Sequence, residues 1–209
     1  MKRRNFMLYG TAGLMMATGP AFAQDKAEPA AETSPEIPDL VWGNPDASVT
    51  LIEYASYTCS HCANFHEAVF KPLKRDYIDP GKIKFIYREV YFDRPSLWAA
   101  MVARCGGDMR ILGIQDMIYK NQREWAGASS PNDMVEQLRR YGRAAGLDDA
   151  QLDACLSDGA KAQAMVDKFE KEAEADGIDA TPTLVLNGVK RSNMSYANLQ
   201  KLLDEELAK

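Results

Sequence analysis

The alternation of apolar and polar residues predicts two short strands around one helix in the first half of the chain. Residues 49–54 form a β-rich run that is typical of a buried strand. A helical pattern follows over about residues 59–77, with a kink expected at Pro72, and the turn sequence at 79–81 ends it. Residues 83–90 predict a second strand. The order strand, helix, strand predicts a right-handed parallel βαβ unit.

The middle of the chain shows helical signals only, from about residue 96 to residue 174. Either Asn132 or Asp133 is expected to cap the helix that runs to about residue 141. The sequence therefore predicts an all-helical block between two α/β segments. We place these three parts at residues 41–92 (first α/β segment), 93–174 (helical block) and 175–209 (second α/β segment).

The end of the chain predicts a hairpin followed by a helix. Residues 183–186 form a strand, and Asn187-Gly188 is a type I′ turn sequence, so residues 189–191 are expected to return antiparallel. Ser195 is expected to cap a last amphipathic helix over residues 196–208. The chain as a whole predicts an α/β fold in the order βαβ, helices, ββα.

The first 23 residues have the layout of an export signal, with a basic start, an apolar stretch and the small-residue ending Ala21-Phe22-Ala23. We expect cleavage after Ala23. Arg3-Arg4 leaves both the general and the twin-arginine export routes open. A membrane anchor is the alternative, but glycines interrupt the apolar stretch and it is short for a span. Residues 24–40 contain three prolines, which predict a flexible leader.

The composition is that of a globular protein, and the charge gives no reason to expect a nucleic-acid partner. Apolar residues make up 46% and charged residues 26%, which is ordinary globular composition. The net charge is −5, and removal of residues 1–23 takes away three positive charges, so we expect no nucleic-acid partner. An exported protein lies where cysteine pairs stay oxidised, which makes its four cysteines informative.

Cys59-Ser60-His61-Cys62 places two cysteines three residues apart where a strand leads into a helix. The first thiol lies at the helix N-terminus, where unpaired N–H groups and the helix dipole favour a negative charge. A protonated His61 would add a cation beside it. We expect these effects to lower the pKa of Cys59 into the range of roughly 3.5–7.5. A stabilised thiolate is a good leaving group, so the pair is predicted to be a thiol oxidant.

Two other interpretations of this motif remain. The two cysteines could form an inert structural disulfide, or they could bind a metal together with His61 and His66. Glu53 lies inside the apolar first strand, where burial would raise its pKa and let it exchange a proton with Cys62. The alternative for Glu53 is an edge-strand glutamate that reaches solvent.

The run Leu-Ile-Glu-Tyr-Ala-Ser-Tyr-Thr-Cys-Ser-His-Cys over residues 51–62, together with Thr181-Pro182-Thr183, resembles the thioredoxin-fold thiol–disulfide oxidoreductases of the DsbA type. The resemblance covers about residues 41–209 and implies a thioredoxin fold with an all-helical domain inserted. It implies that Pro182 is cis and faces the cysteine pair. The backbone at Thr181 would then pair with an extended substrate segment, and Glu53 would be the family's buried acid.

Two positions depart from the best-known enzyme of that family. Ser60 stands where that enzyme has proline, and Thr181 replaces the valine before the cis-proline. Thr181 also occurs in disulfide isomerases and copper-tolerance relatives of that enzyme, and both positions tune the redox potential and substrate release. Isomerase or reductase activity therefore stays open.

Cys105 and Cys155 fall in two different helices of the predicted block. Each could be a small buried residue, but in an exported protein we expect them to form a disulfide. The loop that it closes would stabilise the fold by about 4 kcal/mol on the chain-entropy model. Its role would be structural, because neither cysteine has a partner three residues away.

The sequence therefore predicts a periplasmic oxidoreductase that donates the Cys59–Cys62 disulfide to newly translocated polypeptides. It would be a monomer without a cofactor, reoxidised by a membrane partner of the DsbB type. Ser60, Thr181 and Pro182 would shape its substrate site. The alternatives are an isomerase or reductase kept reduced by a DsbD-like donor, and a copper- or zinc-binding envelope protein.

Overall fold

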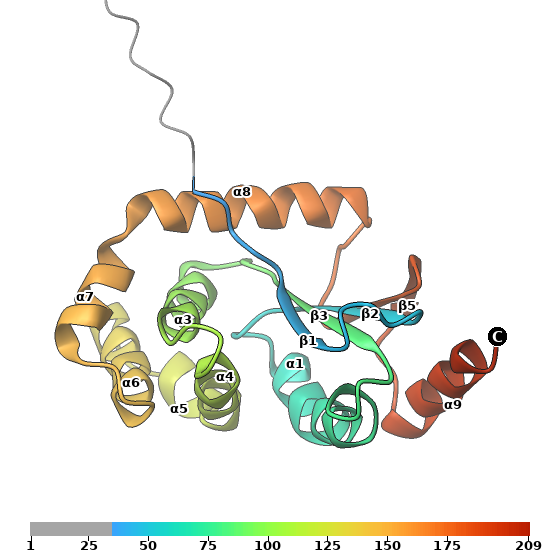
Figure 1. The fold of residues 1–209 in the computed structure, drawn as a ribbon. Helices are drawn as coiled ribbons and strands as arrows, with labels where there is room; N and C mark the ends of the chain where they lie inside the picture. Colours follow the sequence, from blue (N-terminus) through green and yellow to red (C-terminus); the bar gives the residue numbers. More distant parts are fainter. Residues whose placement is uncertain (1–34) are drawn as a thin grey trace, which may run out of the picture. The chain divides into compact units, whose positions relative to one another are not determined.

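The computed structural model describes residues 35–209, which contain a five-stranded sheet with helices on both faces (Figure 1). The strand order is β1-β3-β2-β4-β5, and only the β2–β3 pair is parallel. The predicted export signal and most of the predicted leader lie outside the described residues. The strands are β1 (Leu40–Gly43), β2 (Thr50–Ala55), β3 (Lys84–Glu89), β4 (Thr183–Leu186) and β5 (Val189–Ser192).

The βαβ unit predicted at the start is confirmed, because β2 and β3 pair in parallel through a helical crossover. That crossover is continuous over residues 60–78 and consists of α1 (Ser60–Phe65), η1 (His66–Phe70), α2 (Lys71–Leu73) and η2 (Lys74–Ile78). The chain stays helical through Pro72, where a kink was expected. A proline lacks the backbone N–H that closes a helical turn, and the wider π-helical turns η1 and η2 flank its position.

All described elements between β3 and β4 are helices. They are α3 (Arg94–Cys105), α4 (Ile111–Lys120), α5 (Gln122–Ala126), α6 (Pro131–Ala144), α7 (Asp149–Ser157) and α8 (Gly159–Ala175). The cap predicted for α6 is wrong. Ser130 accepts the N–H of Asp133, and Pro131 occupies the first helical position, where no N–H is needed. Trp125 is fully buried in this block and donates to the carbonyl of Ile118.

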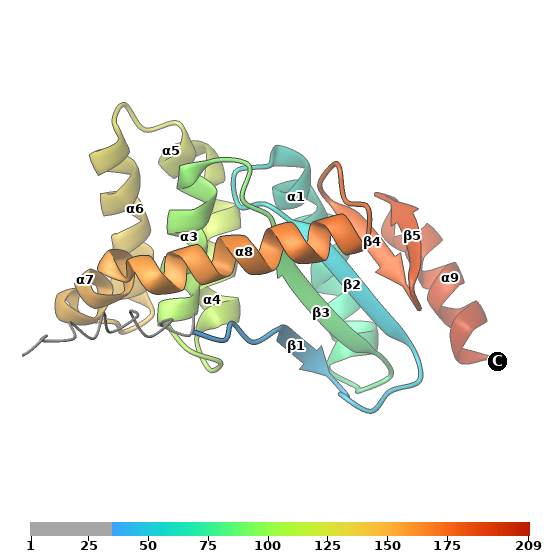
Figure 2. The same ribbon diagram turned by 90° about the horizontal axis from the view of Figure 1, so that it is seen from above.

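The two faces of the sheet are covered by different helices (Figure 2). Successive side chains of β2 point to opposite faces, so Leu51 joins the main core whereas Tyr54 faces the other way. On that second face α8 crosses the sheet, and Phe169 of α8 packs in the cluster that contains Tyr54. The hydroxyl of Tyr54 also donates to the side chain of Asp176 at 2.5 Å.

The first strand was not predicted. Residues up to 40 were expected to be a flexible leader, but Ile37 and Leu40 are buried in the core. Trp42 of β1 stacks on Phe85 of the neighbouring strand, and Arg104 of α3 donates to the carbonyl of Pro38. A four-residue edge strand that follows a proline-rich segment has too few positions to show an alternating pattern.

The hairpin and last helix are confirmed. Asn187 and Gly188 both have positive φ, as a type I′ turn requires. Ser195 caps α9 (Tyr196–Leu207) by accepting the N–H of Asn198. None of the helices within residues 35–209 combines the length and apolar character needed to span a bilayer.

Candidate active site

Cys59 lies at the junction between β2 and α1, as the N-cap residue of the helix. Its extended backbone places its carbonyl to accept the N–H groups of Cys62 and Ala63. Cys59 is partly exposed, whereas Cys62 is fully buried one turn further on. The two thiols are unbridged in this structure. Only the first sulfur is therefore open to an incoming thiol.

The two sulfur atoms have opposite surroundings. A hydrogen bond from the Cys62 thiol is the main cause that lowers the pKa of Cys59, to about 5. Partial burial opposes this shift, whereas the side chain of Thr181 and two backbone N–H groups add to it. Burial raises the pKa of Cys62 far above its usual range, and the charge of Glu53 raises it further. The pair therefore holds one stabilised thiolate and one protonated thiol at neutral pH.

His61 does not contribute in the way that the sequence suggested. Its side chain is exposed. Its contribution to the low pKa of Cys59 is a hydrogen bond from its backbone N–H. The helix N-terminus, rather than an imidazolium, supplies this stabilisation.

Glu53 lies in the middle of the sheet, so an edge-strand position is wrong. β2 is flanked by β3 and β4, with Glu53 opposite Tyr87 on one side and Leu184 on the other. The side chain is buried, and this burial raises its pKa to about 8. A charge on this carboxyl would raise the pKa of Cys62 further. The carboxyl is a protonated acid at neutral pH.

Three buried tyrosines pack together, one of them the neighbour of this acid on the adjacent strand, and sequence reasoning missed them. The ring of Tyr57 packs against those of Tyr119, at 5.2 Å, and Tyr87, at 6.1 Å. The hydroxyls of Tyr87 and Tyr119 are 2.6 Å apart. The charge of Glu53 adds to the raised pKa of all three tyrosines. No local pattern in the sequence would have grouped them.

The Thr181–Pro182 peptide bond is cis and leads directly into β4. The sulfur of Cys59 lies 3.4 Å from the carbonyl oxygen of Thr181. Pro182 is buried, and Thr183 donates to the carbonyl of Ala180. A loop 122 residues away in sequence is thereby placed against the partly exposed sulfur.

Two polar residues of the helical block fix the segment that ends at Cys59, and neither was predicted. Gln122 of α5 is buried, and its amide donates to the carbonyls of Tyr57 at 2.7 Å and of Cys59 at 2.9 Å. Thr58 donates to Asp93 at 2.8 Å, and Asp93 also caps α3. The position of the cysteine thus depends on helices outside the βαβ unit.

The alternative metal site does not fit this arrangement. His66 is buried and lies 3.3 Å from Asp116, with its ring stacked on Phe70 and against Tyr119. Within residues 35–209 no group of three or more His, Cys, Asp or Glu side chains is arranged to hold a metal ion. His66 therefore serves packing and one polar contact.

Cys105 of α3 and Cys155 of α7 are joined by a disulfide with a Cα–Cα distance of 5.9 Å. The two residues are 50 apart in sequence. This disulfide links two helices of the block and is separate from the Cys59–Cys62 pair.

Known proteins with similar sequences and structures support one family. The model of the family described as Thioredoxin matches residues 36–205. A Rickettsia typhi protein provisionally named a protein-disulfide oxidoreductase is 31% identical over 170 residues, which cover 81% of this chain and 62% of that protein. Disulfide bond formation protein D of Bacillus subtilis is 22% identical and covers 80% and 76%. This chain spans less than two thirds of the rickettsial protein's length.

Among solved structures, the crystal structure of Wolbachia pipientis alpha-DsbA1 matches with a TM-score of 0.76 and 26% identity. The match covers 83% of this chain and 93% of that protein. The oxidised BdbD of Bacillus subtilis matches with a TM-score of 0.70 at 23% identity, covering 82% of this chain and 94% of BdbD, which is a likeness of fold. The helical block lies inside the region that the family model matches.

Proposed function

The chain belongs to the thioredoxin family, in its DsbA-type branch, and from that premise we propose that it donates the Cys59–Cys62 disulfide to reduced client polypeptides. The observation that carries this proposal is the opposite shift of the two cysteine pKa values. A stabilised Cys59 thiolate favours the reduced protein over the disulfide, so oxidation of a client thiol runs downhill.

The reaction transfers two electrons from a client dithiol to the cysteine pair. A client thiolate attacks the Cys59 sulfur, a client–Cys59 disulfide forms, and the bond to Cys62 breaks. A second client thiolate then attacks the client sulfur of this mixed disulfide, and Cys59 leaves as a thiolate. The client is left with a disulfide and the protein with two reduced sulfurs.

Glu53 supplies a proton to Cys62 in this scheme. The sulfur that leaves in the first step is buried, and its raised pKa makes it strongly basic. Glu53 holds a proton up to about pH 8, so it has one to give at neutral pH. Transfer leaves a neutral thiol in the core and places the charge on the carboxylate, which must then recover a proton from solvent.

Clients meet the protein at the surface around Cys59. The Thr181 carbonyl beside the sulfur offers an acceptor for an extended backbone, and Ser60 is exposed at the start of α1. Phe92 is 58% exposed in the segment that leads to Asp93, whose carboxylate binds Thr58. An apolar side chain near a reactive sulfur suits unfolded polypeptides, which expose apolar residues.

We place this activity outside the cytoplasm, in the periplasm, because the first 23 residues match an export signal. Newly translocated proteins would be the clients, and a membrane protein of the DsbB type would reoxidise the pair. An isomerase or reductase would instead have to be kept reduced by a membrane donor. The low pKa of Cys59 favours the oxidant.

Oxidative refolding of a reduced client tests the proposal. The oxidised protein is expected to restore client activity in stoichiometric amounts, whereas Cys59→Ser is expected to have no effect. Cys62→Ser is expected to accumulate a mixed disulfide through Cys59, visible by mass spectrometry. A redox titration against glutathione that gave a thioredoxin-like potential, near −270 mV, would contradict the oxidant.

A further inference from the structure

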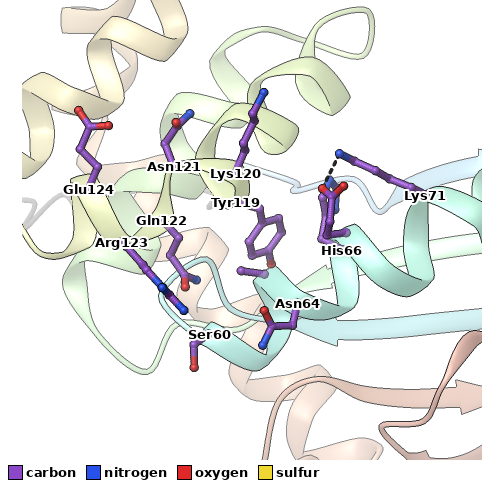
Figure 3. Close-up of a pocket in the computed structure, with 12 residues that line it drawn as sticks. Ser60, Asn64, His66, Lys71, Tyr119, Lys120, Asn121, Gln122, Arg123 and Glu124 are labelled. Carbon is purple, nitrogen blue, oxygen red and sulfur yellow. Dashed lines mark hydrogen bonds and ion pairs between the residues drawn. The ribbon is translucent and has the colours of Figure 1, made fainter.

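A groove of about 660 Å³ lies beside the cysteine pair (Figure 3). One wall is the α1–η1 helix, where Ser60, Ala63 and Asn64 recur at helical spacing and share one face. The opposite wall is formed by residues 119–124, at the junction of α4 and α5. The volume is within the range of about 300–1,000 Å³ that ligand sites occupy. The groove begins one residue after the nucleophile.

Some charged side chains that line the groove form ion pairs, and others do not. Glu67 is compensated by Lys71, whose ammonium lies 2.6 Å from its carboxylate. Arg123 and Lys120 also line the groove, and neither makes an ion pair with any residue in the described part of the chain. An anionic group that enters the groove therefore meets cations whose charge is not yet compensated.

Arg123 is the groove cation whose side chain is directed toward the start of α1. In Figure 3 its side chain extends toward Ser60, whereas those of Lys120 and Glu124 extend away from Ser60. Glu124 lies 3.9 Å from a cation outside the groove, the guanidinium of Arg140. Arg123 thus presents a planar donor group on the side of the groove where Ser60, the residue after Cys59, lies.

We propose that this groove, here called the Arg123 groove, binds a client segment that carries a carboxylate side chain close to the reacting cysteine. The inference rests on the proposed function and adds a substrate preference to it. α1 lies between α5 and the loop that leads to β4 (Figure 2). A client backbone held at the Thr181 carbonyl passes Cys59, and its next residues reach the Arg123 groove.

The net charge of the protein opposes the binding of an acidic client segment. The chain carries a net charge of −5, so its overall field repels acidic peptides. A faster reaction with an acidic peptide must then arise from a local contact. A partly exposed ion pair contributes about 0.2–1 kcal/mol, which corresponds to a rate difference of up to about fivefold.

The experiment uses the oxidised full chain and synthetic peptides with a single cysteine. Glutamate is placed one or two residues before or after the cysteine, and glutamine replaces it in the matched neutral peptides. Stopped-flow measurement of mixed-disulfide formation gives a ratio of acidic to neutral rate for each position. We expect a ratio of about two to five on one side of the cysteine only, falling towards one at 0.5 M salt.

Arg123→Gln is expected to bring that ratio to about one, and Arg123→Glu to bring it below one. Arg110→Gln is the matched control, since Arg110 is exposed at the opposite end of α4, and it keeps the parental ratio. Equal rates for acidic and neutral peptides, or a ratio unchanged in Arg123→Glu, would overturn the inference. If no peptide reacted with Cys59, the proposed function itself would fail.

Discussion

Cys59 and Cys62 belong to the same helical turn, yet their sulfur atoms differ in accessibility and in charge preference. Cys59 receives hydrogen bonds at the helix start, whereas Cys62 is enclosed by apolar side chains and lies near Glu53. The difference comes from solvation and hydrogen bonding at single atoms. At this scale the site is a pair of sulfurs and one buried acid.

Replacement of Glu53 by glutamine tests the buried acid through stability. The unfolded carboxyl loses its proton near pH 4.5 and the folded one near pH 8, so the folded protein binds more protons in between. In the oxidised parental protein, which has no Cys59 thiolate, stability therefore falls as pH rises from 5 to 8. Glu53→Gln is expected to remove this loss, so that its Tm exceeds the parental Tm by an amount that grows across this range. Parallel curves would contradict a buried, proton-binding Glu53.

The same variant tests proton transfer through kinetics. Without the carboxyl, the buried Cys62 thiolate has no acid beside it when it leaves. We expect mixed-disulfide formation in Glu53→Gln to slow by about tenfold or more at pH 7. The pH dependence near 8 is expected to disappear from the rate profile. Stopped-flow traces between pH 6 and 9 measure both effects.

At the scale of elements, the helical block positions the cysteine loop. Gln122 of α5 donates to two carbonyls that flank the reactive sulfur, and Asp93 at the start of α3 holds Thr58. These are contacts between the inserted helices and the β2–α1 junction. The block therefore acts on the site through short polar contacts as well as through burial.

Gln122→Ala is expected to raise the pKa of Cys59, because two carbonyl dipoles near the thiolate lose their donor. It is also expected to lower the free energy of unfolding by about 1–3 kcal/mol. Thiolate absorbance against pH and urea unfolding measure these effects. Gln163→Ala on the exposed surface of α8 is the control, and it leaves both quantities unchanged. An unshifted Cys59 pKa in Gln122→Ala would show that the loop is held by other contacts.

The Cys105–Cys155 disulfide links α3 to α7 across 50 residues. Replacement of both cysteines by alanine is expected to lower stability by about 4 kcal/mol on the chain-entropy model. Because the disulfide is separate from the reactive pair, the thiolate absorbance of Cys59 is expected to titrate as in the parent. Denaturant unfolding and absorbance at 240 nm give the two results. A shifted Cys59 titration would assign the disulfide more than a structural role.

At the scale of the whole molecule, redox state and stability are coupled. The reduced protein contains the Cys59 thiolate, with a pKa of about 5 in the fold against 9.0 as an ordinary thiol. Between these pH values the unfolded reduced chain binds more protons than the folded one. Cys59 therefore contributes stability to the reduced form that grows with rising pH, and the oxidised form lacks this contribution.

We expect the stability difference, reduced minus oxidised, to increase from pH 5 to pH 9. Guanidinium unfolding of both forms at each pH measures it, and Glu53 contributes to both forms so its effect largely cancels. Cys59→Ser, which has no thiolate to stabilise and no disulfide to form, is the control for the reduced parent, and its stability is expected to lack the Cys59 contribution that grows with pH. A difference that stayed constant across this range would contradict the charge assigned to Cys59.

The sequence alone determined the features that depend on neighbouring residues. The cysteine motif at a strand-to-helix junction, the βαβ order, the Asn187-Gly188 turn and the Ser195 cap follow from local backbone chemistry, and the structure has all of them. The resemblance of the motif added the cis-proline at residue 182 and the buried position of Glu53.

Only the tertiary structure decided which distant residues meet at the site. Thr181 is 122 residues from Cys59, Gln122 is 63 residues away, and the charge of Glu53 acts on three tyrosines that are far apart in sequence. The Cys59 thiolate is stabilised by the backbone N–H of His61, and not by its imidazole. Strand β1 was not predicted because its four residues are too few to show a pattern. Such contacts depend on burial and on through-space geometry, which local periodicity does not encode.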